Sequence, residues 1–323
     1  TCLVNPRAAY ETELVYLKTK APKKIAVVGG GVAGMSAATV AASRGHQVTL
    51  FEAAQEIGGQ FNLAKVVPGK EEFNETIRYF KVQIEKTGVE LRLNTKVNRE
   101  QLEREGFDEV IVATGVVPRG LKIEGSHAPQ VLSYAEVLRG AAVGNRVAVI
   151  GAGGIGFDVS EFLLKPEHQP QPQPLADWQR EWGIDPNPSY ISEGGLQPAQ
   201  VDHPVREIYL LQRKTTPLGA GLGKTSGWVH RAQLKKHAVK MLRGVHYKSI
   251  TDEGLWIETN GYDQLLRVDT VVVCAGQESV KDIMPNEGEN TLANYHIIGG
   301  AKLAAELDAK RAIREGAELA AKL

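Results

Sequence analysis

Residues 24–34 read Lys-Ile-Ala-Val-Val-Gly-Gly-Gly-Val-Ala-Gly, and residues 146–156 read Arg-Val-Ala-Val-Ile-Gly-Ala-Gly-Gly-Ile-Gly. In each stretch an apolar, strand-like run leads directly into Gly-x-Gly-x-x-Gly, the fingerprint of a dinucleotide-binding turn. One such motif is a weak signal, but two of them in strand-turn-helix context indicate that one chain binds two dinucleotides. The sequence therefore predicts an α/β fold with two Rossmann-like dinucleotide-binding domains.

The glycines of each fingerprint have separate roles. The first permits a tight turn, the second lets the backbone approach a pyrophosphate, and the third allows the helix to pack closely on the strand. The pyrophosphate lies at the helix N-terminus, where unpaired N–H groups and the helix dipole favour negative charge. A glycine turn without a ligand is the alternative for either motif. The expected contacts are Gly29, Gly31, Val32, Ala33 and Gly34 in the first site, and Gly151, Gly153, Gly154, Ile155 and Gly156 in the second.

The two sites are expected to differ in ligand because of the residue that follows the second strand of each unit. This residue meets the adenosine ribose of the bound dinucleotide. In the first unit this residue is Glu52, whose carboxylate accepts hydrogen bonds from a free 2′-hydroxyl and repels a 2′-phosphate. The first site is therefore expected to hold FAD or NAD. In the second unit the strand runs into Arg213-Lys214, which suits a phosphate dianion and predicts NADPH. A solvated pair of loop cations is the alternative.

Composition narrows the class of protein. The 323 residues include 38 acidic and 38 basic side chains, so net charge predicts attraction neither to nucleic acid nor to an anionic membrane. No apolar run approaches the ~20 residues of a membrane-spanning helix, and no secretory leader is visible, so a cytoplasmic protein is expected. Two cysteines provide no disulfide framework. The sequence starts at Thr1, not Met, and is expected to be a fragment of a longer protein.

Small residues near the carboxyl edge of the first sheet are further candidates, because ligands bind at this edge in such folds. Gly59 and Gln60 give the backbone a second approach to an extended FAD, a plain loop being the alternative. The helix after Gly299-Gly300 is expected either to aim its positive end at the flavin or simply to pack in the core. The other candidate FAD contacts are Thr114, Gly115, Gly300 and Ala301, and Ala275 and Gly276 take the matching place in the NADPH site.

Residues 218–225, Leu-Gly-Ala-Gly-Leu-Gly-Lys-Thr, invite interpretation as a phosphate-binding loop. Leu218 stands where that motif needs its first glycine, so we exclude an ATPase. The segment is expected to line the second site, with Lys224 near a phosphate or ribose. A surface turn is the alternative.

The two halves of the chain repeat one pattern. Residues 25–29 echo residues 147–151, and residues 110–115 echo residues 271–276, so each half opens and closes with a buried parallel strand. Residues 165–205 carry eight of the fifteen prolines and are interpreted as an insertion in the second half. Trp178 and Trp182 suggest that part of the insertion packs down, a disordered linker being the alternative.

Stretches rich in turn residues mark the places where the chain is expected to cross between domains. The chain is expected to end in a short strand, His296–Ile298, and an amphipathic helix, Leu303–Leu323. The first domain is thus predicted to be discontinuous, as in flavoproteins of the two-dinucleotide-binding type. The predicted organisation is an N-terminal arm of residues 1–22, an FAD-binding domain of residues 23–139 and 291–323, and an NADPH-binding domain of residues 140–290 that contains the insertion 165–205.

No residue of this chain is predicted to be catalytic. The eight histidines show neither metal-ligand spacing nor a base beside a nucleophile. Hydride transfer from a reduced nicotinamide to a flavin needs no protein acid, only reacting atoms held close together. Cys274 is expected to be an inert core thiol, whereas Cys2, shortly before Pro6, is a weak match to the last thiolate of an iron-sulfur cluster.

Several longer stretches resemble the C-terminal portion of bacterial NADPH-dependent 2,4-dienoyl-CoA reductase, over essentially the whole chain. The resemblance implies the architecture of that family, in which an FMN-binding barrel, a 4Fe-4S cluster and an FAD/NADPH module are fused. The stretches are Cys2-Leu-Val-Asn-Pro-Arg, Phe51-Glu-Ala-Ala-Gln-Glu-Ile-Gly-Gly-Gln-Phe-Asn, Pro68-Gly-Lys-Glu-Glu-Phe, Leu211-Gln-Arg-Lys, Gly221-Leu-Gly-Lys-Thr-Ser-Gly-Trp-Val-His-Arg and Glu306-Leu-Asp-Ala-Lys-Arg-Ala-Ile.

The resemblance implies that electrons pass from NADPH to FAD and through the cluster to FMN, which reduces dienoyl-CoA in unsaturated fatty-acid β-oxidation. Cys2 would then be the fourth cluster ligand, with three partners upstream of Thr1, and the FMN barrel is missing from this chain. Two departures stand out: Cys2 cannot hold a cluster alone, and Gly300 replaces an aspartate that binds the ribityl chain in many such flavoproteins.

Two alternatives remain open at this point. In the trimethylamine or histamine dehydrogenase type, the corresponding module resembles a structural unit that binds an inert ADP. The intact second fingerprint and Arg213-Lys214 disfavour this alternative. An electron donor like the small subunit of glutamate synthase is disfavoured because its usual cysteine clusters are absent from the sequence.

Overall fold

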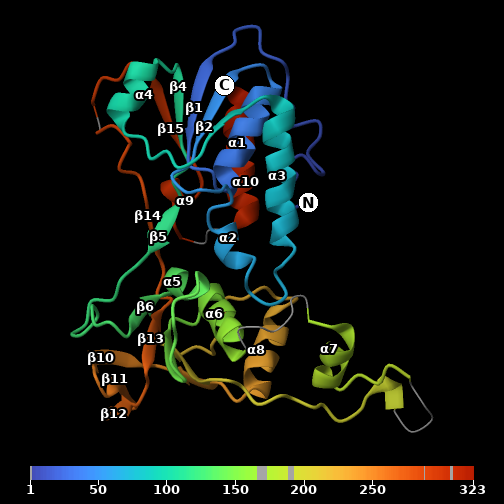
Figure 1. Ribbon diagram of the computed structural model, residues 1–323, viewed down its shortest axis with the longest axis vertical. Helices are drawn as coiled ribbons and strands as arrows, with labels where there is room; N and C mark the ends of the chain where they lie inside the picture. The colour runs from blue at the N-terminus through green and yellow to red at the C-terminus, as the bar shows by residue number, and fades with distance from the viewer. Residues whose placement is uncertain (1, 166–172, 188–192, 287, 306–307) are drawn as a thin grey trace. The chain divides into compact units, whose positions relative to one another are not determined.

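The computed structural model describes residues 2–165, 173–187, 193–286, 288–305 and 308–323 (Figure 1). The chain forms two compact units, and each is described by itself. Unit 1 comprises residues 1–62, 72–117 and 277–323, and unit 2 comprises residues 63–71 and 118–276. The chain thus changes units at 62/63, 71/72, 117/118 and 276/277, whereas the sequence suggested changes at 139/140 and 290/291. The N-terminal arm belongs to unit 1.

Unit 1 is built on a five-stranded parallel sheet of order β15-β4-β1-β2-β3. Four strands come from the first 112 residues, and β15 comes from the C-terminal segment, so the unit is discontinuous in sequence. The central strands are mostly apolar, as expected of parallel strands whose two faces are both covered. The strands are β1 (Lys24–Val28), β2 (Gln47–Phe51), β3 (Glu90–Arg92), β4 (Glu109–Val112) and β15 (Asn294–Ile297).

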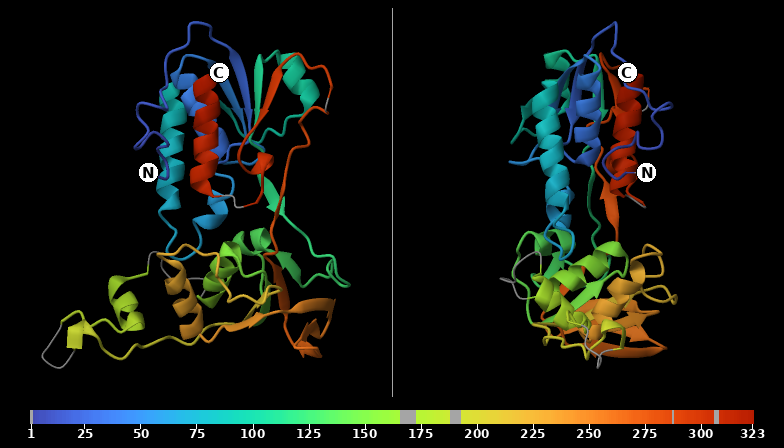
Figure 2. Two further views of the ribbon diagram at one scale, coloured as in Figure 1. Left: turned by 180° about the vertical axis from the view of Figure 1, so that it is seen from behind. Right: turned by 90° about the vertical axis from the view of Figure 1, so that its right-hand side faces the viewer.

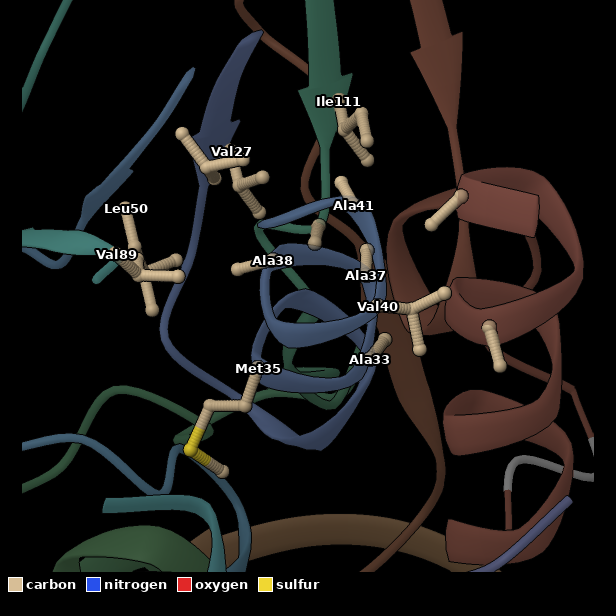
Figure 3. Packing of buried hydrophobic residues seen from close by; sticks show 14 of the residues in the cluster. Val27, Ala33, Met35, Ala37, Ala38, Val40, Ala41, Leu50, Val89 and Ile111 are labelled. Carbon is tan, nitrogen blue, oxygen red and sulfur yellow. The ribbon is translucent and has the colours of Figure 1, made fainter. Parts of the chain in front are cut away.

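Alternate residues of the central strands face different helices, as a period of two requires. Val27 packs in one core with α1 (Val32–Ser43), α3 (Phe73–Thr87) and α10 (Ala309–Lys322). Ala26 and Val28 pack in another core with residues of α4 (Arg99–Glu105). Figure 2 shows α3 and α10 on either side of α1. Figure 3 shows small side chains of α1, among them Ala37, Ala38 and Ala41, in the packed interior. The short helix α9 (Gly299–Lys302) completes the unit, and α2 (Phe61–Ala64) starts in unit 1 and ends in unit 2.

The C-terminal segment differs from the expected helix Leu303–Leu323. The long helix α10 begins only at Ala309, because Asp308 caps it by accepting a hydrogen bond from the Arg311 amide at 2.7 Å. Gly299 and Gly300 lie within the separate short helix α9 instead of preceding one long helix. The expected strand is present as β15, Asn294–Ile297.

Gly316→Ala is expected to destabilise unit 1 by about 2 kcal/mol, although alanine is the better helix former. A Cβ at Gly316 would lie 2.3 Å from the Ala33 carbonyl oxygen, where α10 crosses α1. Urea denaturation of the nucleotide-free protein measures the change. Gly154→Ala is the control, since no atom lies within 4 Å of its Cβ position. Equal stability of both variants would mean that α10 does not pack this closely on α1.

Unit 2 has a second five-stranded parallel sheet of order β6-β13-β7-β8-β9. One face carries α5 (Tyr134–Leu138), α6 (Gly154–Leu164) and α8 (Gly227–Lys236). The other face packs on an antiparallel sheet of β10 (His246–Thr251), β11 (Gly254–Thr259) and β12 (Tyr262–Leu266). The parallel strands are β6 (Val131–Ser133), β7 (Arg146–Ile150), β8 (Glu207–Gln212), β9 (Lys240–Arg243) and β13 (Thr270–Val273).

Residues 63–71 join unit 2 although unit 1 surrounds them in sequence. Leu63 and Val67 are buried in the core beneath α6. The Lys70 Nζ atom lies 2.7 and 2.6 Å from the two carboxylate oxygens of Asp158 on α6. Two short strands lie at the last two changes between units, where β5 (Val116–Pro118) pairs with β14 (Gln277–Ser279).

The described part of the insertion contains helix α7 (Leu175–Trp182) and a short 3-10 turn, Glu193–Gly195, while residues 166–172 and 188–192 lie outside the described residues. Both a buried carboxylate and one indole ring of α7 contact α8. Lys236 Nζ lies 3.6 Å from the centre of the Trp182 ring. Glu181 is 5% exposed and accepts hydrogen bonds from Gln233 at 2.6 Å and Lys165 at 3.3 Å, while His237 Nε2 lies 3.0 Å away. Trp178, by contrast, is 42% exposed.

Acid is expected to weaken the docking of α7. Burial alone would raise the pKa of Glu181, but hydrogen bonds from His237, Gln173 and Gln233 and the charge of Lys165 outweigh it, so the pKa lies well below its ordinary value of 4.5. A carboxyl pKa depressed by folding stabilises the folded state above the unfolded pKa, and the stabilisation declines as pH falls below it.

Stability measured by urea denaturation should therefore fall from about pH 5 to pH 3. Glu181→Gln should lower stability at pH 7 and flatten this dependence. Asp177→Asn is the control, because Asp177 pairs with Arg180 on the exposed side of the same helix. The same pH slope in Glu181→Gln as in the unaltered protein would contradict the assignment.

No helix among the described residues combines the length and apolar character needed to cross a bilayer.

Candidate dinucleotide sites

The first fingerprint requires glycine at two positions for steric reasons. Gly29 has φ +114°, and a Cβ there would lie 2.3 Å from the Ala113 carbonyl oxygen at the end of β4. A Cβ on Gly34 would lie 1.9 Å from the Gly29 carbonyl oxygen. These glycines allow β1, β4 and α1 to meet, so their role is to form the turn and pack the helix.

Gly31 has a different environment. No atom lies within 4 Å of its Cβ position, and it begins α1 with extended backbone and without a side-chain cap. The amides of Val32 and Ala33 therefore start the helix without intrahelical acceptors. The loop after β2 lies alongside, since the Gly58 amide donates to the Gly30 carbonyl at 2.9 Å and a Cβ on Gly59 would be 3.0 Å from Gly31 Cα. The arrangement is an open backbone cradle that fits a pyrophosphate.

Glu52 lies beside this cradle, as the sequence predicts for a ribose-binding acid. Its Oε2 atom accepts a hydrogen bond from the Gly30 amide at 2.8 Å, and its Oε1 atom accepts one from the Ala54 amide at 2.8 Å. The carboxylate thus also fixes the glycine turn, a role that the sequence did not reveal. Each oxygen keeps a second acceptor position, which a ribose hydroxyl can use.

The other candidate FAD contacts gather near the carboxyl edge of the unit 1 sheet. Thr114 donates a hydrogen bond to the Val280 carbonyl, and the Val280 amide donates to the Gly115 carbonyl at 3.0 Å. The Gln60 amide group donates to the Val116 carbonyl at 3.4 Å. These contacts hold the end of β4, the Gly59 loop and the returning chain together.

Helix α9 lies against the beginning of α1. A Cβ on Gly299 would be 2.9 Å from Ala33 Cβ, and the Gly299 amide donates to Glu315 Oε2 at 2.7 Å. The Gly300 carbonyl accepts a hydrogen bond from Ser279 Oγ at 2.7 Å. Ala301 is fully buried in the core beside α4, so its side chain packs inside the unit. Packing inside unit 1 therefore explains much of the conformation of the segment Gly299–Ala301.

The second fingerprint repeats the geometry of the first. A Cβ on Gly151, where φ is +110°, would lie 2.4 Å from the Cys274 carbonyl oxygen, and one on Gly156 would lie 1.8 Å from the Gly151 carbonyl oxygen. Gly153 and Gly154 have no atom within 4 Å of their Cβ positions, and α6 starts there without a side-chain cap. Unit 2 thus contains a second open cradle.

The second cradle adjoins Cys274, which directly follows β13. Burial raises the pKa of Cys274, so its thiol stays protonated and inert. Ile155 is half-buried and packs against the core beneath α6. At the end of β13 Ala275 is half-buried, while Gly276 is exposed with φ +105° and its carbonyl accepts a hydrogen bond from the Arg119 amide at 3.0 Å.

Arg213 and Lys214 follow β8 and are both exposed. In the described parts of the chain, no carboxylate lies within 4.0 Å of either cationic group. The Gly244 amide donates to the Lys214 carbonyl at 3.0 Å, which fixes the backbone of the pair. This corner of unit 2 is therefore basic where the matching corner of unit 1, at Glu52, is acidic.

Lys224 is exposed in the loop that leads from β8 to α8. Leu218 anchors this loop in the core, and Arg231 donates to the Gly219 carbonyl at 3.1 Å. Among the described residues, no hydrogen bond joins Lys224 to the second fingerprint. Its expected role near a phosphate remains a prediction.

Cys2 is exposed in the N-terminal arm. The arm packs on α10, where Arg314 lies 4.7 Å above the Tyr10 ring. No group of three or more histidine, cysteine, aspartate or glutamate side chains in the described residues could hold a metal ion. Cys2 therefore does not form a cluster site with other residues of the described chain.

Sequence reasoning overlooked Arg243, the last residue of β9, which lies in register with Gln212 just before Arg213. The repeat contained the signal, because Leu91-Arg92 and Leu242-Arg243 occupy matching places in the two halves.

Comparisons with known proteins agree with this fold. The family described as pyridine nucleotide-disulphide oxidoreductase matches residues 23–298. A cinnamate reductase of Clostridium sporogenes is 30% identical over 302 residues, which are 93% of this chain and 40% of that protein. The chain thus spans well under half the length of this relative.

Two solved structures extend the comparison. A 2-naphthoyl-CoA reductase in complex with 2-naphthoyl-CoA has a TM-score of 0.81 at 27% identity, covering 100% of this chain and 43% of that chain. Histamine dehydrogenase from Rhizobium sp. 4-9 has a TM-score of 0.74 at 19% identity, covering 100% of this chain and 48% of that chain. The second likeness shows the fold alone.

Proposed function

We propose that this chain, which belongs to the pyridine nucleotide-disulphide oxidoreductase family, is the module of a larger reductase that transfers hydride from NADPH to FAD. The family implies FAD and a nicotinamide coenzyme, and the choice of NADPH is our inference. The observation that carries it is the contrast between two similar cradles, one beside Glu52 and the other beside Arg213-Lys214.

The residues present fit both cofactors. Gly31 and the first turn of α1 would hold the FAD pyrophosphate, and Glu52 would bind its adenosine ribose. Gly153 and Gly154 would hold the second pyrophosphate at the start of α6. When bound, reduced nicotinamide supplies the hydride and the flavin accepts it. The residues of the chain bind and orient, and none is required as a proton donor.

For the whole reductase we propose a conjugated acyl thioester of the 2,4-dienoyl-CoA class as the substrate. Cinnamate, named for one relative, has a double bond conjugated to its carboxyl group, and 2-naphthoyl-CoA, named for another, is a CoA thioester. A dienoyl-CoA combines both features. The FMN barrel, and a 4Fe-4S cluster with Cys2 as one ligand, would require residues outside this sequence.

Anaerobic titration of the FAD-loaded protein tests the proposal. NADPH should bleach the visible flavin absorption band, and NADH should need about a hundredfold higher concentration for the same rate. A protein that cannot be loaded with FAD would contradict the proposal, as would equal reduction by both coenzymes.

The same titration decides the alternative of an inert ADP in the second cradle. That alternative predicts a bound nucleotide that NADPH does not displace and a flavin that NADPH does not reduce. The likeness to histamine dehydrogenase keeps this alternative in view at the level of the fold. The unpaired Arg213-Lys214 corner favours NADPH, because ADP has no 2′-phosphate for these cations to bind.

A further inference from the structure

We propose that Arg243, at the end of β9, is a third residue that recognises the 2′-phosphate of NADPH, together with Arg213 and Lys214. The inference rests on the proposed function and deepens it by adding a specificity determinant from a different strand.

Strand register places Arg243 at this corner. β8 and β9 are parallel, with Gln212 opposite Arg243, so both strands end at the same edge of the sheet. The turn after β9 is hydrogen-bonded to the segment after β8. The Val245 amide donates to the Gln212 carbonyl at 3.0 Å, and the Gly244 amide donates to the Lys214 carbonyl at 3.0 Å. Two backbone hydrogen bonds thus hold the Arg243 segment beside Arg213 and Lys214.

The charge of Arg243 is unneutralised in the described structure. Its side chain is exposed, and no carboxylate of a described residue lies within 4.0 Å of the guanidinium. Two other exposed cations of the same unit have carboxylate partners: Lys240 at the other end of β9 contacts Glu207, and Lys248 contacts Asp263. The three cations around the ends of β8 and β9 are therefore left available to an anion.

Unit 1 provides an internal comparison. There Arg92 ends β3 in register with Phe51, just before Glu52, as Arg243 ends β9 in register with Gln212, just before Arg213. Arg92 is neutralised by Glu90 at 2.9 Å and Glu105 at 2.8 Å. The repeat thus places an arginine at this corner in both units. In unit 1, where Glu52 disfavours phosphate, the arginine has carboxylate partners. In unit 2, where the adjacent residues are basic, it has none among the described residues. This difference matches the two ligands proposed for the sites.

The chemistry of a 2′-phosphate favours several donors. Its charge is close to a dianion, and a guanidinium presents a planar fork of donors that matches two phosphate oxygens. Because Arg243 is exposed, solvent and salt screen its charge, so its contribution should be moderate and should shrink at high ionic strength.

Binding of two probes to the FAD-loaded protein tests the inference: 2′,5′-ADP, which has the 2′-phosphate, and 5′-AMP, which lacks it. Calorimetry gives the Kd of each. Arg243→Gln should raise the Kd for 2′,5′-ADP about tenfold and leave that for 5′-AMP within about twofold. Arg243→Lys should recover part of the loss. Arg92→Gln, the matched control from unit 1, should leave both values unchanged.

The outcomes separate this inference from the function on which it rests. If Arg213→Gln weakens 2′,5′-ADP binding but Arg243→Gln does not, the role of Arg243 is refuted and the NADPH assignment stands. If the unaltered protein binds both probes equally, the NADPH assignment fails and the inference falls with it. Equal weakening of both probes by Arg243→Gln would also refute a phosphate-specific role.

Discussion

Gly31→Ala is expected to abolish FAD binding while leaving the fold as stable as before. The Cβ of alanine would enter a space that no protein atom occupies within 4 Å, so packing does not oppose it. The same space is where the backbone at the start of α1 would meet the pyrophosphate, and a methyl group there keeps the phosphates from the helix amides. The flavin content of the purified protein should therefore fall to near zero, with a Kd for FAD raised at least about a hundredfold.

Gly34→Ala provides the contrast for this prediction. Its Cβ would lie 1.9 Å from the Gly29 carbonyl oxygen, so the backbone must shift and stability should fall by about 3 kcal/mol. Urea denaturation of the FAD-free proteins separates loss of binding from loss of fold. If Gly31→Ala retained FAD at normal affinity, the open cradle of unit 1 would not be the pyrophosphate site.

The parts of the fold that the sequence predicted well are those decided by local backbone chemistry. Strands β1 and β7 begin and end where their apolar runs do, since Gly29 and Gly151 turn the chain with positive φ. The first and third glycines of each fingerprint are required by contacts within a few residues or with the adjoining strand. The acidic and basic corners follow from the residues that directly succeed β2 and β8.

Features that depend on residues distant in sequence could not be predicted in the same way. Residues 63–71 belong to unit 2, where Lys70 contacts Asp158 across 88 positions of sequence. Glu181 is buried where distant residues meet it, among them Gln233 of α8 and His237 directly after α8. The ion pairs that neutralise Arg92 are likewise visible only in the folded unit.

The sequence does contain a signal for the true start of the last helix, α10. Asp308, a good N-cap residue placed before Ala309, marks the true start of the last helix. Apolar periodicity alone extended that helix back to Leu303, where α9 has already ended.

Replacing Arg213 and Lys214 together by glutamine is expected to lower kcat/KM for NADPH about a hundredfold and to change that for NADH less than about twofold. Both cations are exposed and, in the described structure, without a carboxylate partner, so their removal leaves no buried charge unpaired. The loss should therefore fall on the ligand that bears the 2′-phosphate and spare the fold. Steady-state reduction of a dye by each coenzyme measures both constants.

Arg267→Gln is the control for net charge, because Arg267 is an exposed arginine of unit 2 that pairs with Glu253 away from this corner. The NADPH preference of the unaltered protein should also weaken as salt rises, since exposed charges are screened, whereas that of the double variant should not. An equal fall in kcat/KM for NADPH and NADH would indicate general damage to unit 2. An unchanged preference would show that the basic corner does not select the coenzyme, and the electrostatic contrast with Glu52 would then lose its functional meaning.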